Sequence, residues 1–534
     1  MLLYRYTMIF SIIFFSIRGQ VMIFKVFSSR LIVSFGTLFF LFSCSSEQST
    51  LEKVENQMKR YDEAKIFLIE RNYMDDAPVS HLRLEFFLGN LVSDAFSEEE
   101  LKAVSALHQK IIQANADKAK RISVIDLSEV RQDTTKVLQL CKEIPKGGML
   151  HVHPWGLFTT DIVRQILLKN NPIIEPEKLI NYIENKDPGQ FIYDREKASL
   201  LSFPKVSKFN VLSKEQQEKF IEFFVLPNEP IAHDFERFDS IFTFIDLMLG
   251  DEGRENKLLL AYKMFLNNAA QQGVSYVEFT EYFSPKIENI RQLENWAEEF
   301  LRETGIIVRW NVSFLRFFPA EENAAIMKEW NELLIKNPTE VITGIDILSL
   351  ERGFPALEVA QDMYAYLAGF NAKNPDHPLE MTMHAGELGD RRNVRDAILM
   401  GTSRIGHGVL LHNDPITLEY ARRRSLPIEI NLTSNHKLGV HDMYNSPHPF
   451  LDFLRLGLQV SLSTDNDAIF STDIVQECVA AVSTTDIEYS ELKTMSYNGI
   501  NASFSAEPIK QKLLLDLDES FRLFETKYNA RDQN

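Results

Sequence analysis

The sequence predicts an α/β protein with (β/α)8 architecture, a TIM barrel, and three observations lead to that expectation. Eight short apolar runs rich in β-branched residues recur after Pro145. Longer helical stretches lie between them, and strands that alternate with helices imply a parallel sheet. No internal repeat is visible that would favour a solenoid. Eight strand-and-helix repeats therefore suggest a sheet that closes into a barrel.

The composition is typical of a globular protein with a large core. The chain has 534 residues, of which 45% are hydrophobic and 25% charged, and its formal net charge is −18. This acidic balance argues against nucleic acid as a partner, because no excess of Lys and Arg is available to collect phosphates. A small neutral or cationic molecule is the expected ligand.

The cysteine count restricts both disulfide and metal chemistry. The chain contains only Cys44, Cys141 and Cys478, with no CxxC pair. No disulfide framework or thiolate zinc site is expected, and at most one bridge could join Cys141 to Cys478. Any metal must therefore bind to histidines and carboxylates.

Residues 1–44 resemble a signal peptide that ends in a lipobox. They carry four basic residues and no acidic one, and an apolar run covers 31–42. Leu41-Phe42-Ser43-Cys44 follows directly and is similar to a bacterial lipobox, in which the cysteine is lipidated. An uncleaved anchor or a start at Met22 are the alternatives. We expect an exported bacterial protein, periplasmic or on the outer surface, whose membrane contact is a lipid anchor at Cys44.

Residues 45–142 are predicted to form a helical extension before the barrel. Apolar and charged residues interleave there without strand-like alternation. Ser97 followed by three glutamates is typical of an N-cap with an acidic first turn, and it predicts a helix over 97–114. The charges of this region are interpreted as a solvated face.

The remaining residues, 143–534, are predicted to form the barrel domain. Its eight strands are expected at 149–153, 274–279, 306–314, 341–347, 380–384, 404–407, 427–432 and 459–464. Crossover helices are expected at 255–272, 292–304, 320–336, 357–371 and 392–400. The stretch 156–273 is too long for one crossover, so we expect it to hold a helical insert that caps the barrel mouth after the first strand.

Histidines and an acid stand where the predicted strands end. In a parallel barrel the carboxyl ends of all strands open on one face. His151 and His153 close the first strand, and their spacing of two points both side chains to the same side. Later strands end in His384, His407 and Asp465. His151 and His153, joined by a third histidine and the aspartate, give a set of three histidines and one aspartate. Such a set suits zinc with one position left for water, and iron, cobalt or manganese could use the same ligands.

Five motifs occur in the order of a known family. They are Pro-Lys-Gly-Gly-Met-Leu-His-Val-His at 145–153, Met-His-Ala-Gly-Glu at 383–387, Arg-Ile-Gly-His-Gly at 404–408, Ile-Glu-Ile-Asn-Leu-Thr-Ser-Asn at 428–435 and Ser-Leu-Ser-Thr-Asp at 461–465. Over about 145–470 the chain resembles the adenosine deaminases, which are metal-dependent hydrolases. The Pro-Lys-Gly-Gly segment and the helical extension are most similar to the secreted deaminase growth-factor branch.

The resemblance implies a zinc-dependent conversion of adenosine, or of a related aminopurine nucleoside, to inosine and ammonia. It implies one Zn²⁺ per chain, bound by His151, His153, His384 and Asp465. Zinc lowers the pKa of bound water to about 7 and so supplies a nucleophile at neutral pH. His407 would take a proton from that water or stabilise the developing alkoxide. Glu387 would donate a proton to a ring nitrogen, which requires a raised pKa.

Three positions depart from the family pattern, and all concern substrate recognition. Trp155 stands where the family has an acid that holds a sugar hydroxyl, and an indole NH cannot accept a hydrogen bond. Asn466, followed by Asp467, replaces the second of two paired aspartates, although its amide can still donate to a purine nitrogen. Ser349 replaces a glycine after the fourth strand, which narrows the approach to the base.

Aromatic residues of the insert admit two interpretations. His233, Phe235, Phe238, Phe242 and Phe244 could form an apolar wall around a planar base, or they could be ordinary core residues of a helix.

Two other functions are compatible with the same fold. One is metal-dependent hydrolysis of an amide, imide or ester in another small molecule. Glu387 and a single metal favour deamination over it, since no lysine that could bridge a second metal is visible at a strand end. The other is a catalytically inactive binding protein. The sequence makes no prediction of the oligomeric state.

Overall fold

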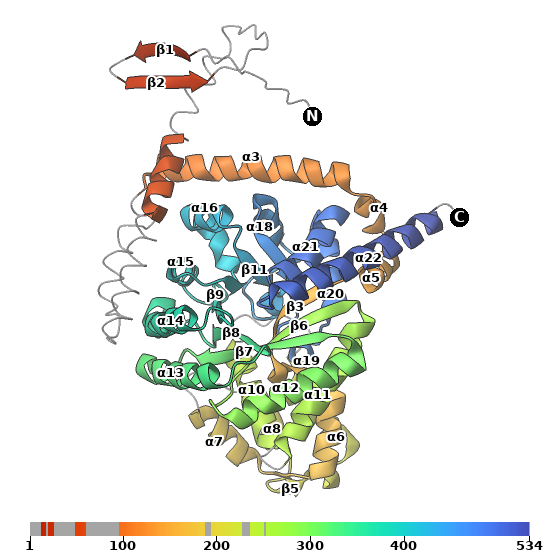
Figure 1. Ribbon diagram of the computed structural model, residues 1–534. Coiled ribbons are helices and arrows are strands. Elements are labelled where there is room, and N and C mark those ends of the chain that lie inside the picture. The colour runs from red at the N-terminus through yellow and green to blue at the C-terminus, as the bar shows by residue number, and fades with distance from the viewer. Residues whose placement is uncertain are drawn as a thin grey trace, which may run out of the picture.

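Eight parallel strands form one sheet at the centre of the molecule (Figure 1). In this computed structural model the described residues are 12–17, 20–25, 48–59, 96–186, 194–226, 235–249 and 253–532. The strand order is β12-β11-β10-β9-β8-β7-β6-β3, and a parallel bridge between Val152 and Asp465 brings the two end strands together. The predicted (β/α)8 barrel is therefore confirmed.

Each strand of the barrel coincides with one of the eight apolar runs. The strands are β3 (Gly147–Val152), β6 (Val274–Glu281), β7 (Ile307–Leu315), β8 (Ile342–Leu348), β9 (Glu380–Ala385), β10 (Arg404–His407), β11 (Pro427–Ile430) and β12 (Gln459–Leu462). Nearly every residue in them is buried, because the strands face the barrel interior on one side and helices on the other. This explains why they are continuous apolar runs rather than alternating patterns.

Amphipathic helices surround the barrel where the sequence predicts them. The five expected crossover helices are α11 (Arg254–Gln271), α12 (Ile287–Thr304), α13 (Ala320–Lys336), α14 (Ala356–Lys373) and α15 (Arg391–Met400). The later helices are α16 (Pro415–Arg423), α17 (Leu432–Lys437), α18 (Phe450–Leu456), α19 (Asp467–Phe470), α20 (Ile474–Thr484), α21 (Tyr489–Asn501) and α22 (Glu507–Asp532).

The part of the chain before the barrel is helical where it is described from residue 48 onward. Residues 48–59 are helical, and α3 (Glu98–Ile122), α4 (Leu127–Val130) and α5 (Thr134–Glu143) follow. The Ser97 side chain accepts a hydrogen bond from the Glu100 amide, as an N-cap does, and α3 continues eight residues beyond the predicted end. Before residue 48 only the antiparallel strands β1 (Ile12–Ile17) and β2 (Gln20–Lys25) are described. The predicted lipobox and Cys44 lie outside the described residues.

Two contacts fasten this N-terminal region to the barrel. Helix α3 lies across α16, α18 and α21 (Figure 1), and its buried His108 Nε2 is 3.0 Å from the Glu419 carboxylate of α16. A disulfide joins Cys141 of α5 to Cys478 of α20, with a Cα–Cα distance of 5.6 Å. It is the one bridge that the cysteine count permits.

The helices of the insert lie between β3 and the crossover helix α11. They are α6 (Thr160–Asn170), α7 (Pro176–Lys186), α8 (Asp194–Leu201), α9 (Lys214–Ile221) and α10 (Phe235–Leu249), with a short antiparallel pair, β4 (Ile173–Ile174) and β5 (Ser207–Lys208). Helix α11 packs against β6 on the outside of the barrel. We call helices α6–α10 the cap; of these, α10 reaches the barrel mouth, where it and Arg254 at the start of α11 line a cavity.

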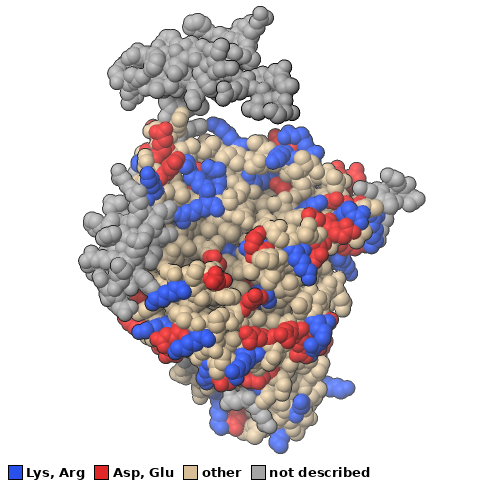
Figure 2. All heavy atoms as spheres, viewed as in Figure 1, with Lys and Arg blue, Asp and Glu red and all other residues tan. Residues whose placement is uncertain are grey.

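The surface carries charges of both signs. On the face shown in Figure 2, basic and acidic side chains are interspersed. Among the described residues, no helix combines the length and the apolar character that crossing a membrane requires.

Candidate active site

Four donor side chains meet at the carboxyl ends of the strands. His151 lies in β3, His153 directly follows it, His384 lies in β9, and Asp465 follows β12. The Asp465 amide donates to the His151 carbonyl at 3.0 Å, and the His153 amide donates to the Asp465 carbonyl at 2.9 Å. The backbone that closes the barrel thus brings these residues together. We call these four residues the donor cluster.

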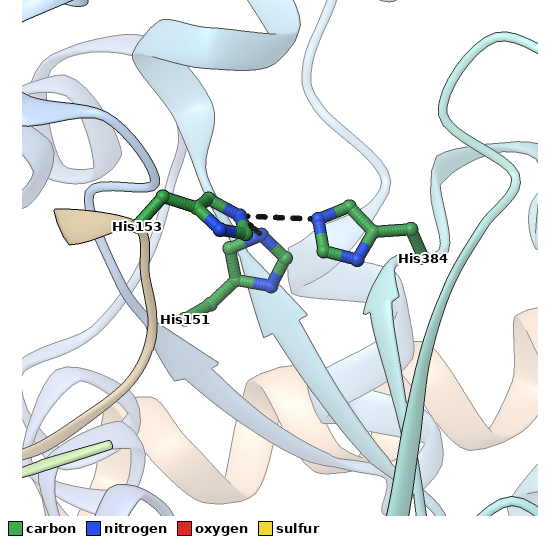
Figure 3. A group of neighbouring side chains, drawn as sticks. All are labelled: His151, His153 and His384. Carbon is green, nitrogen blue, oxygen red and sulfur yellow. Dashed lines mark hydrogen bonds between the residues drawn. The ribbon is translucent and has the colours of Figure 1, made fainter. Parts of the chain in front are cut away.

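The spacing of the donor cluster fits a tetrahedral metal ion. The His153 Nε2 atom is 3.3 Å from His151 Nε2 and 3.2 Å from His384 Nε2 (Figure 3). Asp465 Oδ1 is 3.3 Å from His153 Nε2 and 3.7 Å from His151 Nε2. Zinc ligands at about 2.0 Å from the ion in a tetrahedron are ~3.3 Å from one another. Such close approach of nitrogen and oxygen lone pairs is repulsive unless a cation or a proton lies between them. The residues present therefore fit a bound zinc ion.

Buried carboxylates orient two of the imidazoles. Glu429 Oε2 is 2.8 Å from His151 Nδ1, and Asp346 Oδ1 is 3.1 Å from His384 Nδ1. A proton held on Nδ1 by a carboxylate leaves the Nε2 lone pair free for a metal, which is the usual arrangement behind metal-binding histidines. Neither acid was predicted from the sequence. A charged residue inside a wholly buried strand, as in Ile345-Asp346-Ile347 and Ile428-Glu429-Ile430, was the signal that could have found them.

Glu387 lies beside the donor cluster on a loop that a second carboxylate holds. The Glu351 side chain accepts hydrogen bonds from the backbone amides of Gly386, Glu387 and Leu388 at 3.0, 2.7 and 3.3 Å. Burial and the nearby carboxylates of Asp465 and Glu351 raise the pKa of Glu387 well above its ordinary value. The Glu387 carboxyl is therefore suited to carry a proton at neutral pH.

His407 faces the same region from the end of β10. Its Nε2 atom is 3.6 Å from Glu387 Oε1, and the ring is fully buried. Its φ angle is +64°, and Asp465 and Ser349 also have positive φ, at +62° and +86°. Non-glycine residues in this conformation are strained and gather at functional sites. Three such residues at one place support a functional interpretation of this end of the barrel.

A cavity of about 420 Å³ opens in front of these groups. Phe235, Phe238 and Phe242 of α10 line it, whereas Phe244 packs on Phe223 and Phe224 inside the cap. His233 lies outside the described residues. Three of the five predicted aromatic residues thus do form a wall of the cavity.

The three departures from the family pattern line the same cavity. Trp155 lies beneath the Arg254 guanidinium, 4.5 Å from its carbon to the indole centroid. Ser349 has the positive φ that a glycine would adopt at this position. The turn after β8 therefore keeps its backbone conformation and carries a serine side chain in addition. The Asn466 amide nitrogen donates to Asp465 Oδ1 at 2.6 Å, which leaves one of its two N–H groups for a ligand.

Glu281 at the end of β6 is an acid of the cavity wall that the sequence analysis did not find. Its Oε2 atom accepts a hydrogen bond from the Tyr262 hydroxyl at 2.5 Å, and the Tyr262 oxygen in turn accepts from Trp310 Nε1 at 3.0 Å. Burial raises the pKa of Glu281 to about 7, although hydrogen bonds from Tyr262 and Trp155 act in the opposite direction and lower it. No spacing relative to the histidine motifs marks this residue in the sequence.

Comparison with known proteins agrees with this geometry. A family model described as adenosine deaminase matches residues 213–520. An adenosine deaminase of Clostridium acetobutylicum is 30% identical over 265 residues, which cover 47% of this chain and 74% of the relative. The family match begins after His151 and His153, so these two histidines lie outside it. Strand β3, which carries His151, meets the matched part where the barrel closes, at the bridge between Val152 and Asp465.

Solved structures share the fold at low sequence identity. The adenine deaminase of Arthrobacter aurescens has a TM-score of 0.52 at 18% identity, over 71% of this chain and 99% of that one. An amidohydrolase of Burkholderia ambifaria, solved with bound zinc, also has a TM-score of 0.52 at 18% identity, over 74% and 94% of the two chains.

The parallel eight-stranded barrel and the cluster of donors at its carboxyl end define an enzyme of the (β/α)8 class. This class places a nucleophile and its activating groups at the mouth of the barrel, where the donor cluster and Glu387 lie. Within the class, the chain belongs to the adenosine deaminase family.

Proposed function

We propose that this protein is a zinc-dependent hydrolytic deaminase of adenosine or a closely related aminopurine nucleoside. One Zn²⁺ per chain would be held by the donor cluster. The observation that carries the proposal is the convergence of His153, His384 and Asp465 of that cluster with a buried carboxyl, Glu387, in a single cavity walled by aromatic rings. When bound, zinc would act as a Lewis acid and lower the pKa of a water molecule.

The residues around the cavity match what deamination requires. Water contributes its oxygen to the carbon that bears the amino group, and its two protons end on the ring nitrogen and on the departing ammonia. Protonated Glu387 would deliver a proton to the ring nitrogen, and its carboxylate would then regain one from the added oxygen. Asn466 would donate a hydrogen bond to another purine nitrogen through its remaining N–H. The phenyl rings of α10 would cover the base and exclude water.

The direct test measures metal and product together. Protein that lacks residues 1–44 should contain about one zinc per chain and should convert adenosine to inosine with release of ammonia, which is followed by ultraviolet absorbance. Adenine belongs in the same assay, because one solved relative is described as an adenine deaminase. If no aminopurine is deaminated by the zinc-loaded protein, the proposal is wrong.

Glu281 supports a sugar-bearing substrate. It lines the cavity next to Trp155, the residue that replaces the family's hydroxyl-binding acid, so an acid from β6 can take over that task. In Glu281→Gln the only remaining oxygen must serve the Tyr262 hydroxyl, and an NH2 group would face the cavity in place of an acceptor. We expect the KM for adenosine to rise about tenfold, which corresponds to the loss of one hydrogen bond.

Deoxy substrates provide the control for Glu281. A nucleoside that lacks the hydroxyl bound by Glu281 should have a higher KM than adenosine with the wild type, but the same KM as adenosine with Glu281→Gln. Comparing 2′-, 3′- and 5′-deoxyadenosine therefore identifies the hydroxyl that Glu281 contacts. Glu298→Gln, an exposed change on α12, should behave as wild type. An unchanged KM in Glu281→Gln for all four nucleosides would exclude the contact.

We also propose that the protein is exported and anchored through a lipid at Cys44. The disulfide between Cys141 and Cys478 supports export, because such bridges persist in oxidising compartments. Cells that express the full chain should incorporate a radiolabelled fatty acid into it, and Cys44→Ser should abolish that labelling. Equal labelling of both proteins would contradict lipidation at this residue.

A further inference from the structure

A row of buried hydrogen bonds connects His407 to the backbone of α18, outside the cavity. From the structure we infer that Asn435 and His448 are positioning residues that fix the tautomer of His407, so that an Nε2–H group faces the cavity. Neither residue lines the cavity or belongs to the donor cluster, and both are buried. The inference rests on the proposed function for its catalytic meaning, but each step below rests on hydrogen-bond geometry alone.

The first step concerns His448, which precedes α18. The Phe450 backbone amide donates to His448 Nδ1 at 3.2 Å. A backbone N–H can only donate, so Nδ1 must carry a lone pair. The neutral His448 ring therefore has its proton on Nε2.

The second step concerns the amide of Asn435 in α17. His448 Nε2 is 3.2 Å from Asn435 Oδ1 and, because it carries the proton, it donates to that oxygen. This contact fixes the orientation of the amide, whose oxygen and nitrogen are otherwise interchangeable. The Asn435 NH2 group must then face the other way, toward His407.

The third step assigns the proton on His407. Asn435 Nδ2 is 3.0 Å from His407 Nδ1 and can only donate to it. The Nδ1 atom of His407 is thus an acceptor, and a neutral ring with a lone pair on Nδ1 carries its proton on Nε2. Among the described residues, that Nε2 has no hydrogen-bond partner, and it lines the cavity 3.6 Å from Glu387 Oε1.

The assignment decides between the two roles that the sequence left open for His407. A ring that presents Nε2–H is a hydrogen-bond donor and has no lone pair with which to take a proton from water. A donor fixed in advance beside the reacting carbon stabilises negative charge as it develops on the added oxygen. His407 would therefore act as the oxyanion donor of the proposed reaction.

The tautomer can be measured directly by nuclear magnetic resonance. In zinc-loaded protein labelled with ¹⁵N-histidine, the nitrogen shifts and long-range couplings to ring protons distinguish the two neutral tautomers. The His407 signals are assigned by their loss in His407→Gln. We expect the Nε2–H tautomer in wild type, and an Nδ1–H tautomer there would overturn the inference whether or not the protein deaminates adenosine.

Two variants test whether Asn435 and His448 cause that tautomer. Asn435→Asp places an acceptor against His407 Nδ1, so the ring should switch to the Nδ1–H tautomer. His448→Leu frees the Asn435 amide to rotate, so both tautomers should be populated and kcat for adenosine should fall about tenfold or more at unchanged KM. His448→Gln can still donate to Asn435 Oδ1 and should restore the single tautomer and most of kcat.

The outcomes separate this inference from the proposed function. If wild type turns over adenosine but both variants keep the Nε2–H tautomer, the positioning roles are wrong and the function stands. If wild type has no deaminase activity, the function is wrong, and the NMR spectra still decide the tautomer. Should His448→Leu fail to fold, Asn435→Asp decides the question, because aspartate is isosteric with asparagine.

Discussion

Replacing His151 by alanine should remove both zinc and deaminase activity. The His151 ring supplies one of the four donors, and a vacant ligand position leaves the ion with three. We expect zinc to fall from about one per chain to near zero, and kcat/KM for adenosine to fall at least ~10³-fold, since metal activation contributes several kcal/mol. Elemental analysis and the inosine assay measure the two effects.

The fold should survive this change. Glu429 loses the imidazole at Oε2, but its Oε1 still accepts from Arg404 Nε at 2.5 Å and from the Thr382 hydroxyl at 2.9 Å, so the buried carboxylate keeps a cationic partner. His377→Ala, an exposed histidine before β9, is the matched control and should keep zinc and activity. If His151→Ala retained its full zinc content, His151 would not be a zinc ligand.

Glu387→Gln should slow ammonia release severely while zinc stays bound. Glutamine has the size of a protonated glutamic acid but cannot give up a proton, so the step at the ring nitrogen loses its acid. We expect kcat to fall by about 10²–10⁴-fold, the usual contribution of a general acid. The assay compares turnover with zinc content in the same sample.

The zinc content of Glu387→Gln distinguishes loss of the acid from loss of the metal site. Because the Glu387 backbone is held by Glu351 through amide hydrogen bonds, the loop does not depend on the Glu387 side chain. Glu358→Gln, an exposed change in α14, serves as the matched control. Unchanged ammonia release by Glu387→Gln would show that another group carries the proton.

The barrel could be predicted from the sequence because its strands are buried on both faces. Such strands appear as continuous apolar runs, and all eight were placed within a few residues of their observed bounds. The donor cluster was predictable for a related reason, since a histidine or aspartate at the end of an apolar run is conspicuous. His151 and Asp465, more than three hundred positions apart, meet only because the barrel closes.

The groups that the sequence analysis missed act across the fold rather than along the chain. Asp346 and Glu429 hold imidazoles that belong to other strands, and no local pattern connects an acid to a histidine in a distant part of the sequence. Glu281 is similar, because its place beside Trp155 depends on how β3 and β6 pair. Donor and acceptor assignments, such as those around His407, require atomic distances.

The attachment of the N-terminal helices has a practical consequence for recombinant work. A version trimmed to the family match, or to the first barrel strand, would leave Cys478 as an unpaired thiol and would remove α3 from its contacts with α16, α18 and α21. The Glu419 carboxylate would lose His108 and be opened to solvent. We expect the free thiol of the trimmed protein to oxidise and the protein to aggregate during purification. Inactivity of the trimmed protein would therefore not show that the protein with its N-terminal helices is inactive.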